Sequence, residues 1–256
     1  TRTISSAASD VYKRQHTRGP PRGYFPEPTK SILVVKPESV ERAKARFHPL
    51  GFQVKTGARY LGGYIGHKDD QTTYVQQKVD EWTLGICRLG VIARSSPQCA
   101  FIALQKSYQQ EWQHIQRVVN NISDQFAPVE DAILKNFLPS LLGGSTPSII
   151  PPELRTLLSL PVKSAGLGLP FPTTSADNRH ETSSQCTSIL TDSLIASTPL
   201  SMGDHHTAMR EGRASARTSG IAMAGSTLDH LCSTLSPLEV RRTRQNEEAG
   251  AWLSIQ

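Results

Sequence analysis

Between Thr72 and Leu138, apolar residues recur at intervals of three and four, and this spacing constrains the fold more than any other feature of the chain. Such spacing places side chains on one face of an α-helix, and that face must be buried against another element. The first helix has its apolar face at Val75, Val79, Trp82, Ile86, Leu89 and Ala93. Because Trp82 lies on this stripe, we expect it in a core rather than in a platform that stacks bases.

Two further helices are expected after the first. Ser96 and Pro97 suit the N-cap and the first position of a helix whose apolar residues are Phe101, Leu104, Tyr108, Trp112, Ile115 and Val119. The third helix is expected from Pro128 to about Leu138, with Ile133, Leu134 and Phe137 facing inward. Three amphipathic helices with short connections can bury one another as a small bundle, which we assign to residues 71–144.

The segment before the bundle, residues 19–70, begins with a strand and a helix. The apolar run 31–35 follows a proline-rich turn and predicts a buried strand. A short helix is expected to begin at Pro37, with apolar residues at Val40, Ala43 and Phe47.

Two more strands are expected in the same segment. Residues 50–57 alternate between apolar and polar, as in a half-buried strand. Residues 58–66 predict another strand, and the Gly62-Gly63 pair in its middle indicates a bulge, a close backbone approach or a hairpin bend. Asp70 is expected to cap the helix that starts near Thr72. Together these elements predict a small β-α-β-β unit.

The periodic spacing of apolar residues becomes less regular after the bundle. Residues 145–173 predict a proline-rich linker with one short helix, followed by a Gly-rich segment that forms an extended loop or a hairpin. Residues 174–256 are rich in Ser and Thr and have a thin apolar pattern, so they are expected to be mostly helical and partly disordered. The predicted fold class is therefore α+β.

Positive charge is concentrated at the start of the chain. The formal net charge is +6, and residues 1–50 contain 10 Lys and Arg against 4 Asp and Glu. Such a segment favours a polyanionic partner, although a solvated basic tail is the simpler interpretation. Residues 1–18 show no core-forming pattern and resemble translated adaptor sequence, so a non-native or disordered leader is expected there.

Several functional classes find little support in the sequence. No apolar run is long enough to cross a membrane, so we expect an intracellular protein, cytoplasmic or nuclear, with no membrane partner. The four cysteines form no CxxC pair, which is typical of reduced thiols. No zinc site is expected either, because no finger-like spacing links the candidate ligands His180, Cys186, His205, His206, His230 and Cys232.

Two motifs in this order resemble the end of the palm of reverse transcriptases from non-LTR retrotransposons. The stretch GYFPEPTKSILVV (23–35) matches the family's fourth palm motif at Gly23, Pro28, Lys30 and Ser31. The stretch ARYLGGYIG (58–66) matches the hairpin called the primer grip at Tyr60, Leu61, Gly62 and Gly63. The helices that follow are similar to the family's thumb, and LPVKSAGLGLP (160–170) resembles a segment that follows the thumb.

The resemblance implies a function in RNA-directed DNA synthesis. It implies that the chain positions a primer–template duplex, with Arg22, Lys30, Lys55 and Arg59 as candidate phosphate contacts beside the primer grip. It also implies that Lys30 approaches the triphosphate of the incoming nucleotide in an accessory catalytic role. Considered without the resemblance, Lys30 is a strand-edge lysine that extends into water.

The carboxylates that hold Mg²⁺ in this family should precede Gly23, and they are absent from residues 1–22. We therefore expect a fragment that binds no metal or other cofactor and is inactive alone. Mg²⁺ and the missing N-terminal palm and fingers of the same polyprotein would complete the enzyme. The alternative is a non-enzymatic helical module that binds nucleic acid or another partner. In either case, Arg210, Arg213 and Arg217 would lie on one face of a helix, either solvated or along a nucleic-acid backbone.

Overall fold

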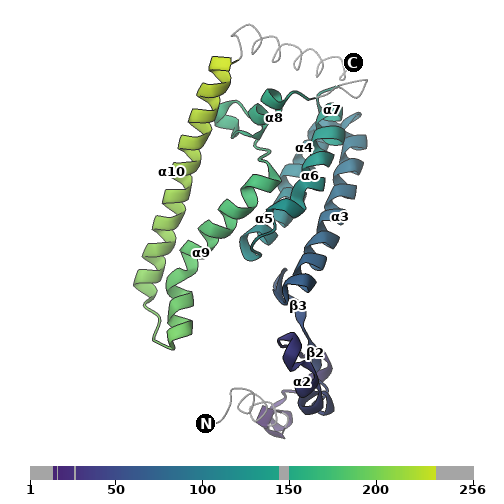
Figure 1. Cartoon of the computed structure of the whole chain (residues 1–256), viewed down its shortest axis with the longest axis vertical. Coiled ribbons are helices and arrows are strands. Elements are labelled where there is room, and N and C mark those ends of the chain that lie inside the picture. The colour runs from purple at the N-terminus through teal and green to yellow at the C-terminus, as the bar shows by residue number, and fades with distance from the viewer. Residues whose placement is uncertain (1–13, 16, 26, 144–149, 235–256) are drawn as a thin grey trace. The chain divides into compact units, whose positions relative to one another are not determined.

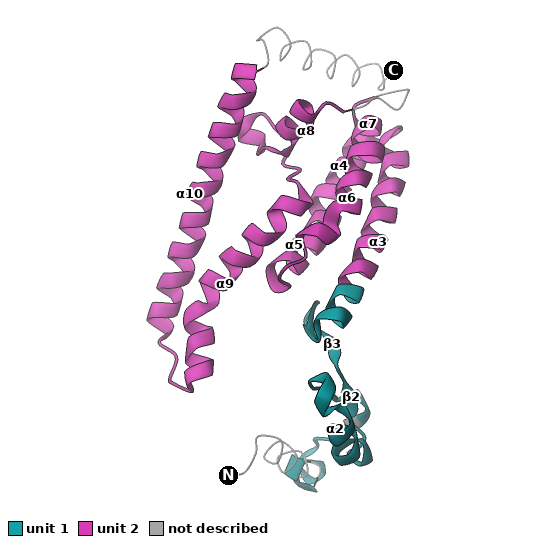
Figure 2. Ribbon diagram, viewed as in Figure 1, with its two compact units in different colours: residues 1–74 teal, residues 75–256 magenta. Residues whose placement is uncertain are grey.

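The computed structural model describes residues 14–15, 17–25, 27–143 and 150–234, which form two compact units (Figures 1 and 2). Unit 1 comprises residues 1–74 and unit 2 comprises residues 75–256. Most of the leader expected at residues 1–18, together with Pro26, lies outside the described residues. The described part is mostly helical with two small sheets, which agrees with the α+β class in broad terms.

Unit 1 contains a short β-α-β arrangement. Its elements are the 3-10 helices η1 (Pro20–Arg22) and η2 (Pro28–Lys30), β1 (Ile32–Val34), η3 (Pro37–Ser39), α2 (Val40–Phe47), η4 (His48–Leu50) and β2 (Gln53–Lys55). Strands β1 and β2 pair in parallel, with Leu33 opposite Val54. Helix α2 buries Ala43 and Phe47, and the Phe47 ring packs edge-on against Phe52 with centroids 5.9 Å apart. The expected strand–helix–strand order is therefore confirmed.

The expectation that the first strand is buried is wrong. Ile32 is 43% exposed, and the other two residues of β1 are only half-buried. A sheet of two three-residue strands, with one short helix packed on it, cannot cover both faces of a strand. The apolar run is thus an edge of a small unit.

The remaining elements of unit 1 are the hairpin strands β3 (Gly57–Tyr60) and β4 (Gly63–Gly66) and the start of α3 (Lys68–Ala93). Helix α3 begins four residues before the expected start near Thr72, so Asp70 lies inside its first turn and the expected capping role is wrong. The Asp70 carboxylate instead accepts a hydrogen bond from Thr56 Oγ1, which attaches the hairpin to the helix.

Unit 2 contains the three expected amphipathic helices (Figure 1). The first is α3. The second is built from α4 (Pro97–Ala103), a π-helical turn (Leu104–Tyr108) and α5 (Gln109–Val118), and the third from η6 (Ser123–Phe126), α6 (Ala127–Ala132), a π-helical turn (Ile133–Phe137) and α7 (Leu138–Leu141). All six predicted core residues of α3 are buried. Trp82 lies 6.2 Å from Trp112 and 6.0 Å from Phe126, between ring centroids, so its core position is confirmed.

Some details of these helices differ from expectation. Phe101, Tyr108 and Leu134 are only half-buried, and Ser96 makes no capping hydrogen bond through its side chain. The two π-helical turns had no signal in the apolar spacing. Helix α3 also approaches its neighbours closely, because a Cβ added at Gly90 would lie 2.9 Å from the carbonyl oxygen of Asn136.

The C-terminal part of unit 2 is helical, as expected. It contains α8 (Pro152–Ser159), the 3-10 helix η8 (Val162–Ser164), α9 (Pro172–Ala196) and α10 (Met202–Thr234). Helices α9 and α10 pack side by side (Figure 1), and Ala224 and Leu231 of α10 pack with Leu160, which follows α8. Residues 162–171 form a loop without strand pairing, so the loop alternative holds and the hairpin is wrong. The partial disorder expected within residues 174–256 stays a prediction, and residues 235–256 of this range lie outside the described residues.

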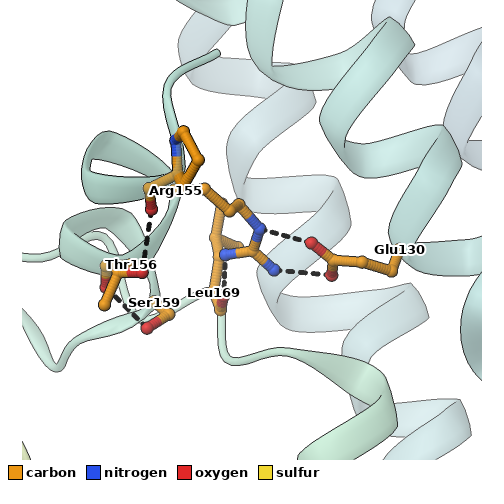
Figure 3. A network of polar contacts seen from close by, with 6 residues as sticks. Glu130, Arg155, Thr156, Ser159 and Leu169 are labelled. Carbon is orange, nitrogen blue, oxygen red and sulfur yellow. Dashed lines mark hydrogen bonds and ion pairs between the residues drawn. The ribbon is translucent and has the colours of Figure 1, made fainter.

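A buried ion pair fixes this loop to the bundle (Figure 3). Arg155 of α8 is 2% exposed. Its Nε and Nη2 donate to the two carboxylate oxygens of Glu130 of α6 at 2.6 and 2.7 Å. Its Nη1 donates to the carbonyl oxygen of Leu169 at 2.8 Å, and its guanidinium lies 4.1 Å from the centre of the Phe171 ring. One side chain therefore joins α6, α8 and the loop.

Glutamine side chains of the second helix support the same loop. Gln109 Nε2 donates to the carbonyl oxygen of Gly168 at 3.2 Å, and the fully buried Gln116 donates to that of Pro172 at 2.8 Å. Gly166 faces the end of α8, where an added Cβ would lie 2.6 Å from the Leu157 oxygen. Glycine is thus required at position 166, where the loop backbone approaches that of α8.

We predict that Arg155→Met destabilises unit 2 by about 3–5 kcal/mol, because it leaves the largely buried Glu130 carboxylate without its partner. Urea unfolding followed by tryptophan fluorescence measures this, since Trp82 and Trp112 lie in the core of unit 2. The matched control is Lys135→Ala, which removes an exposed pair with Asp131 and should cost about 0.5 kcal/mol or less. Equal losses in the two variants would contradict the role given to Arg155.

Candidate nucleic-acid interface

The hairpin β3–β4 is the best-defined part of the candidate site. Its strands are antiparallel, and Tyr60 pairs with Gly63 at the closed end. The two turn residues, Leu61 and Gly62, have φ values of 47° and 82°. Two successive positive φ values are typical of the tight turns that match the twist of a two-stranded hairpin. Of the alternatives left open by the sequence, the hairpin bend is therefore confirmed.

One face of this hairpin is fixed against the start of α3. The Tyr64 ring stacks on Tyr74 with centroids 5.1 Å apart, and the Tyr74 hydroxyl donates to the Gly62 carbonyl oxygen at 3.3 Å. A Cβ added at Gly57 would lie 2.6 Å from the Tyr64 ring, so glycine is needed at this position. Burial and, secondarily, the charge of Asp70 raise the pKa of Tyr64 above its ordinary value.

The other face of the hairpin and its tip are exposed. Ala58 pairs with Ile65, and Tyr60 lies two residues from Ala58, so these side chains share the face opposite Tyr64. Tyr60 is 60% exposed, Ile65 is 48% exposed, and Leu61 at the turn is 79% exposed. We call Tyr60, Leu61 and Ile65 the hairpin surface. This apolar surface is exposed, while Tyr74 of α3 holds the opposite face of the hairpin.

The predicted cations do not all lie on that surface. Arg59 is exposed but pairs with Tyr64, so it lies on the opposite face from Tyr60. Arg22 is exposed at the end of η1. Lys30 ends η2, where its Nζ lies 2.7 Å from Glu27 Oε2 and its side chain is 78% exposed. Tyr60 of the predicted motif and its neighbour Arg59 therefore lie on opposite faces of the hairpin.

Lys55 lies beside a groove of about 480 Å³ that we call the β2 groove. Its lining residues are Thr29, Lys44, His48, Gly51, Phe52, Gln53, Val54 and Lys55. Gln53 Nε2 donates to the Thr29 carbonyl oxygen at 2.7 Å, and the Gln53 amide donates to that of Ser31 at 3.0 Å. These bonds hold the segment that carries Lys30 against the edge of the groove that carries Lys55.

A second groove in unit 1 was not expected from the sequence. It measures about 720 Å³ and is lined by Val34, Val35, Lys36, Pro37, Glu38, Thr56, Gly66, His67 and Lys68. Sequence reasoning missed Lys36, Lys44, His48, His67 and Lys68 as lining residues. Only Lys44 and His48 carried a signal, because a spacing of four residues puts them side by side at the end of a helix.

Elsewhere, the structure describes the remaining candidates as follows. Arg210, Arg213 and Arg217 lie exposed on α10, so their helical spacing is confirmed while their role stays a prediction. In the described ranges, no group of His, Cys, Asp and Glu side chains is arranged to hold a metal ion. No described helix combines the length and the apolar character needed to cross a bilayer.

No protein-family model matches this chain, and comparisons with curated proteins and with solved structures also give no match.

We predict that Gly62→Val loosens the hairpin, whereas Gly62→Asn preserves it, because asparagine tolerates positive φ and a β-branched residue does not. Amide hydrogen exchange of β3 and β4 measures the difference. Gly62→Val should accelerate exchange by about tenfold or more, which corresponds to a strain of about 1–2 kcal/mol. Equal protection in the two variants would contradict the positive φ at this position.

Proposed function

We propose that this chain is part of a reverse transcriptase of the non-LTR retrotransposon type, and that unit 1 holds a primer–template duplex for RNA-directed DNA synthesis. In this proposal β1-α2-β2 is the edge of the palm, the hairpin β3–β4 is the primer grip, and the helices of unit 2 belong to the thumb. Such a protein would act in the cytoplasm or nucleus, where RNA templates and DNA targets are found. The missing N-terminal palm and fingers would be its partners.

The observation that carries the proposal is the geometry of the hairpin. Its Tyr64 face is fixed by the ring of Tyr74, while Tyr60 and Leu61 are presented to solvent from a tight turn. A rigid strand pair with an exposed aromatic residue suits contact with the sugar and base edge of a nucleotide. A solitary exposed apolar residue needs no explanation, but three on one preorganised hairpin favour a binding surface.

The charge distribution supports the same unit. Residues 19–70 contain nine Lys and Arg and five Asp and Glu, whereas residues 71–256 contain 15 and 16. The excess positive charge therefore remains in unit 1 when the leader is set aside. Contacts to phosphate dominate non-specific binding to nucleic acids, so this excess favours a polyanionic ligand.

The complete enzyme would need Mg²⁺, which the resemblance assigns to carboxylates upstream of Gly23 rather than to this chain. The chain's proposed contribution is to position the duplex and the nucleotide, which is a large part of the catalysis of phosphoryl transfer.

We predict that the chain binds an RNA–DNA duplex with an affinity that falls steeply as salt increases. Fluorescence anisotropy across a salt series measures this. Replacing Lys55 and Arg59 with Gln should reduce the slope of log K against log salt by about 1–2, because about 0.7–0.9 counterions are released per phosphate contact. The paired control replaces Lys106 and Lys163, both exposed in unit 2, with Gln and should leave the slope unchanged.

Failure to bind at low salt, or equal effects of the two double variants, would contradict the assignment to unit 1. The sequence that precedes Gly23 in the transcript separates the two classes of function. An aromatic-x-Asp-Asp strand there supports the polymerase, whereas its absence supports a non-enzymatic module that binds nucleic acid.

The proposed role of Lys30 follows from its exposure. Its partner Glu27 is itself 58% exposed, and exposed ion pairs contribute little to stability, so a triphosphate could replace Glu27 at low cost. The 3-10 helix η2 and the hydrogen bonds from Gln53 fix the backbone from which Lys30 extends.

We predict that Lys30→Ala, in a chain joined to an upstream palm, slows single-turnover nucleotide addition by about 10²-fold, as expected for the loss of a positioned charge or acid. Duplex affinity should change much less. Lys30→Arg should restore charge but not proton donation, because arginine stays protonated. Glu27→Gln serves as the matched control, since it frees the lysine without removing it. An unchanged rate in Lys30→Ala would make this turn purely structural.

A further inference from the structure

Helix α10 carries three exposed arginines that the function proposed above does not use. Arg210, Arg213 and Arg217 follow one another at intervals of three and four residues, which places their side chains along one face of the helix. They line a groove of about 540 Å³, which we call the α10 groove. Its lining residues are His206, Met209, Arg210, Arg213, Ala214 and Arg217. None of these six residues is acidic, so the lining of the groove is cationic.

The packing of α9 against α10 turns this face towards solvent. Helix α9 packs against the half of α10 that carries the arginines (Figure 1). At Gly212 an added Cβ would lie 2.9 Å from Cys186 Sγ of α9, and the Cys186 thiol donates weakly to the Met209 carbonyl oxygen at 3.8 Å. Gly212 is half-buried, whereas the three arginines are exposed. The contact with α9 therefore fixes the rotation of α10 about its own axis and directs the arginines outward.

The arginines of the α10 groove also lack the acidic neighbours that neutralise cations on other helices. Lysines of α2, α3 and the third bundle helix each form an ion pair with a carboxylate three or four residues away. No position three or four residues from the α10 arginines carries Asp or Glu, and no ion pair joins them to another described residue. Arg213 Nη2 instead donates to Met209 Sδ at 4.0 Å, and a thioether sulfur is a weak acceptor. Like charges at this spacing repel one another, so an anionic ligand would relieve the repulsion.

The spacing of the three guanidinium groups suits a row of phosphates. An α-helix rises about 1.5 Å per residue, so the path from Arg210 to Arg217 covers about 10 Å of the axis. Each strand of a duplex carries one phosphate per about 3.4 Å of its axis, so this length matches about three phosphates. A guanidinium group also presents planar pairs of N–H donors that fit phosphate oxygens. We infer that the α10 groove is a second surface of this chain that binds the sugar–phosphate backbone of a nucleic acid.

An acidic protein segment is the other polyanion that arginines bind, and the lining of the groove favours a nucleic acid. Protein–protein interfaces depend on a few large side chains, often aromatic, that fill well-packed pockets. Contacts to phosphate need no such pocket and dominate non-specific binding to nucleic acids. Met209 and Ala214 are the only apolar residues that line the α10 groove, and Met209 is half-buried, which leaves little room for an apolar anchor.

The choice of a nucleic acid also rests on the function proposed above. The two surfaces nevertheless belong to different units, because every residue assigned to the duplex surface lies in unit 1 and the α10 groove lies in unit 2. Variants of one surface leave the other intact, so the two assignments can fail separately.

The experiment measures binding of the full chain to a short RNA–DNA duplex by fluorescence anisotropy across a salt series. Replacing the three α10 arginines with Gln should reduce the slope of log K against log salt by about 2–3, because about 0.7–0.9 counterions are released per phosphate contact. The matched control replaces three exposed cations elsewhere in unit 2, Arg94, Lys106 and Lys163, with Gln and should leave the slope unchanged.

Replacing the same three arginines with Lys separates charge from a structural role. This variant keeps the positive charge, so it should keep the slope, while its affinity at a given salt concentration should fall because lysine lacks the planar fork of donors. Circular dichroism should show equal helix content in all variants, since Arg, Gln and Lys have similar helix propensities. Each single Arg→Gln variant should reduce the slope by about 0.7–0.9, which keeps the test decisive if the triple variant loses helix content.

The inference is overturned if the triple Gln variant keeps the slope of the parent chain, or if the control variant lowers the slope equally. Polyglutamate that binds the parent chain more tightly than the duplex does would identify an acidic protein segment as the partner, and would also overturn it. A reduced slope in the α10 variant, together with an unchanged slope in the variant of Lys55 and Arg59, would contradict the surface proposed for unit 1 and support the α10 groove.

Discussion

The bidentate ion pair between Arg155 and Glu130 is the contact on which the C-terminal half of unit 2 depends. The carboxylate belongs to the third bundle helix, and the guanidinium belongs to α8, on the other side of a segment outside the described residues. The remaining Arg155 donor contacts the loop that leads directly into α9. Because a buried charge without its partner is strongly unfavourable, α8 and this loop are expected to dock together or not at all.

This polar attachment matters because the burial of apolar side chains contributes little to the stability of the C-terminal half of unit 2. Helices α9 and α10 together place only a handful of side chains in the interior, among them Ala176, Cys186, Ala224 and Leu231. Small residues contribute little transfer free energy. Buried hydrogen bonds from Gln116 and Arg155 therefore carry the specificity of docking, since an altered arrangement would leave these donors unsatisfied. The bundle core around Trp82 has the opposite character, with aromatic rings packed in contact.

The difference between these regions explains what the sequence could predict. The bundle followed from periodicity, because each helix carries its own apolar stripe within a few turns. The pairing of Arg155 with Glu130 did not, because its partners are 25 residues apart in sequence and neither is unusual alone. The hairpin at Gly62 was predicted as one of several options, and its turn required backbone angles that only the structure supplies. The exposure of Ile32 was missed because an apolar run does not reveal how many layers will cover it.

Three cations of this chain differ in their burial and in their hydrogen-bond or ion-pair partners, and these differences decide how easily each can bind a ligand. Arg155 is buried, and each of its three guanidinium nitrogens donates a hydrogen bond, so a ligand that recruited it would break the contacts that attach α8 to the bundle. Lys30 is exposed in a weak pair, so a ligand can take it at little cost, but water and salt screen its attraction. Arg179 is half-buried, and its buried Nε has no hydrogen-bond partner among the described residues, so water screens its charge less than that of Lys30. The cost of recruiting a cation to a ligand therefore depends on its burial and on whether the fold already neutralises its charge, and neither sequence pattern nor net charge reveals these conditions.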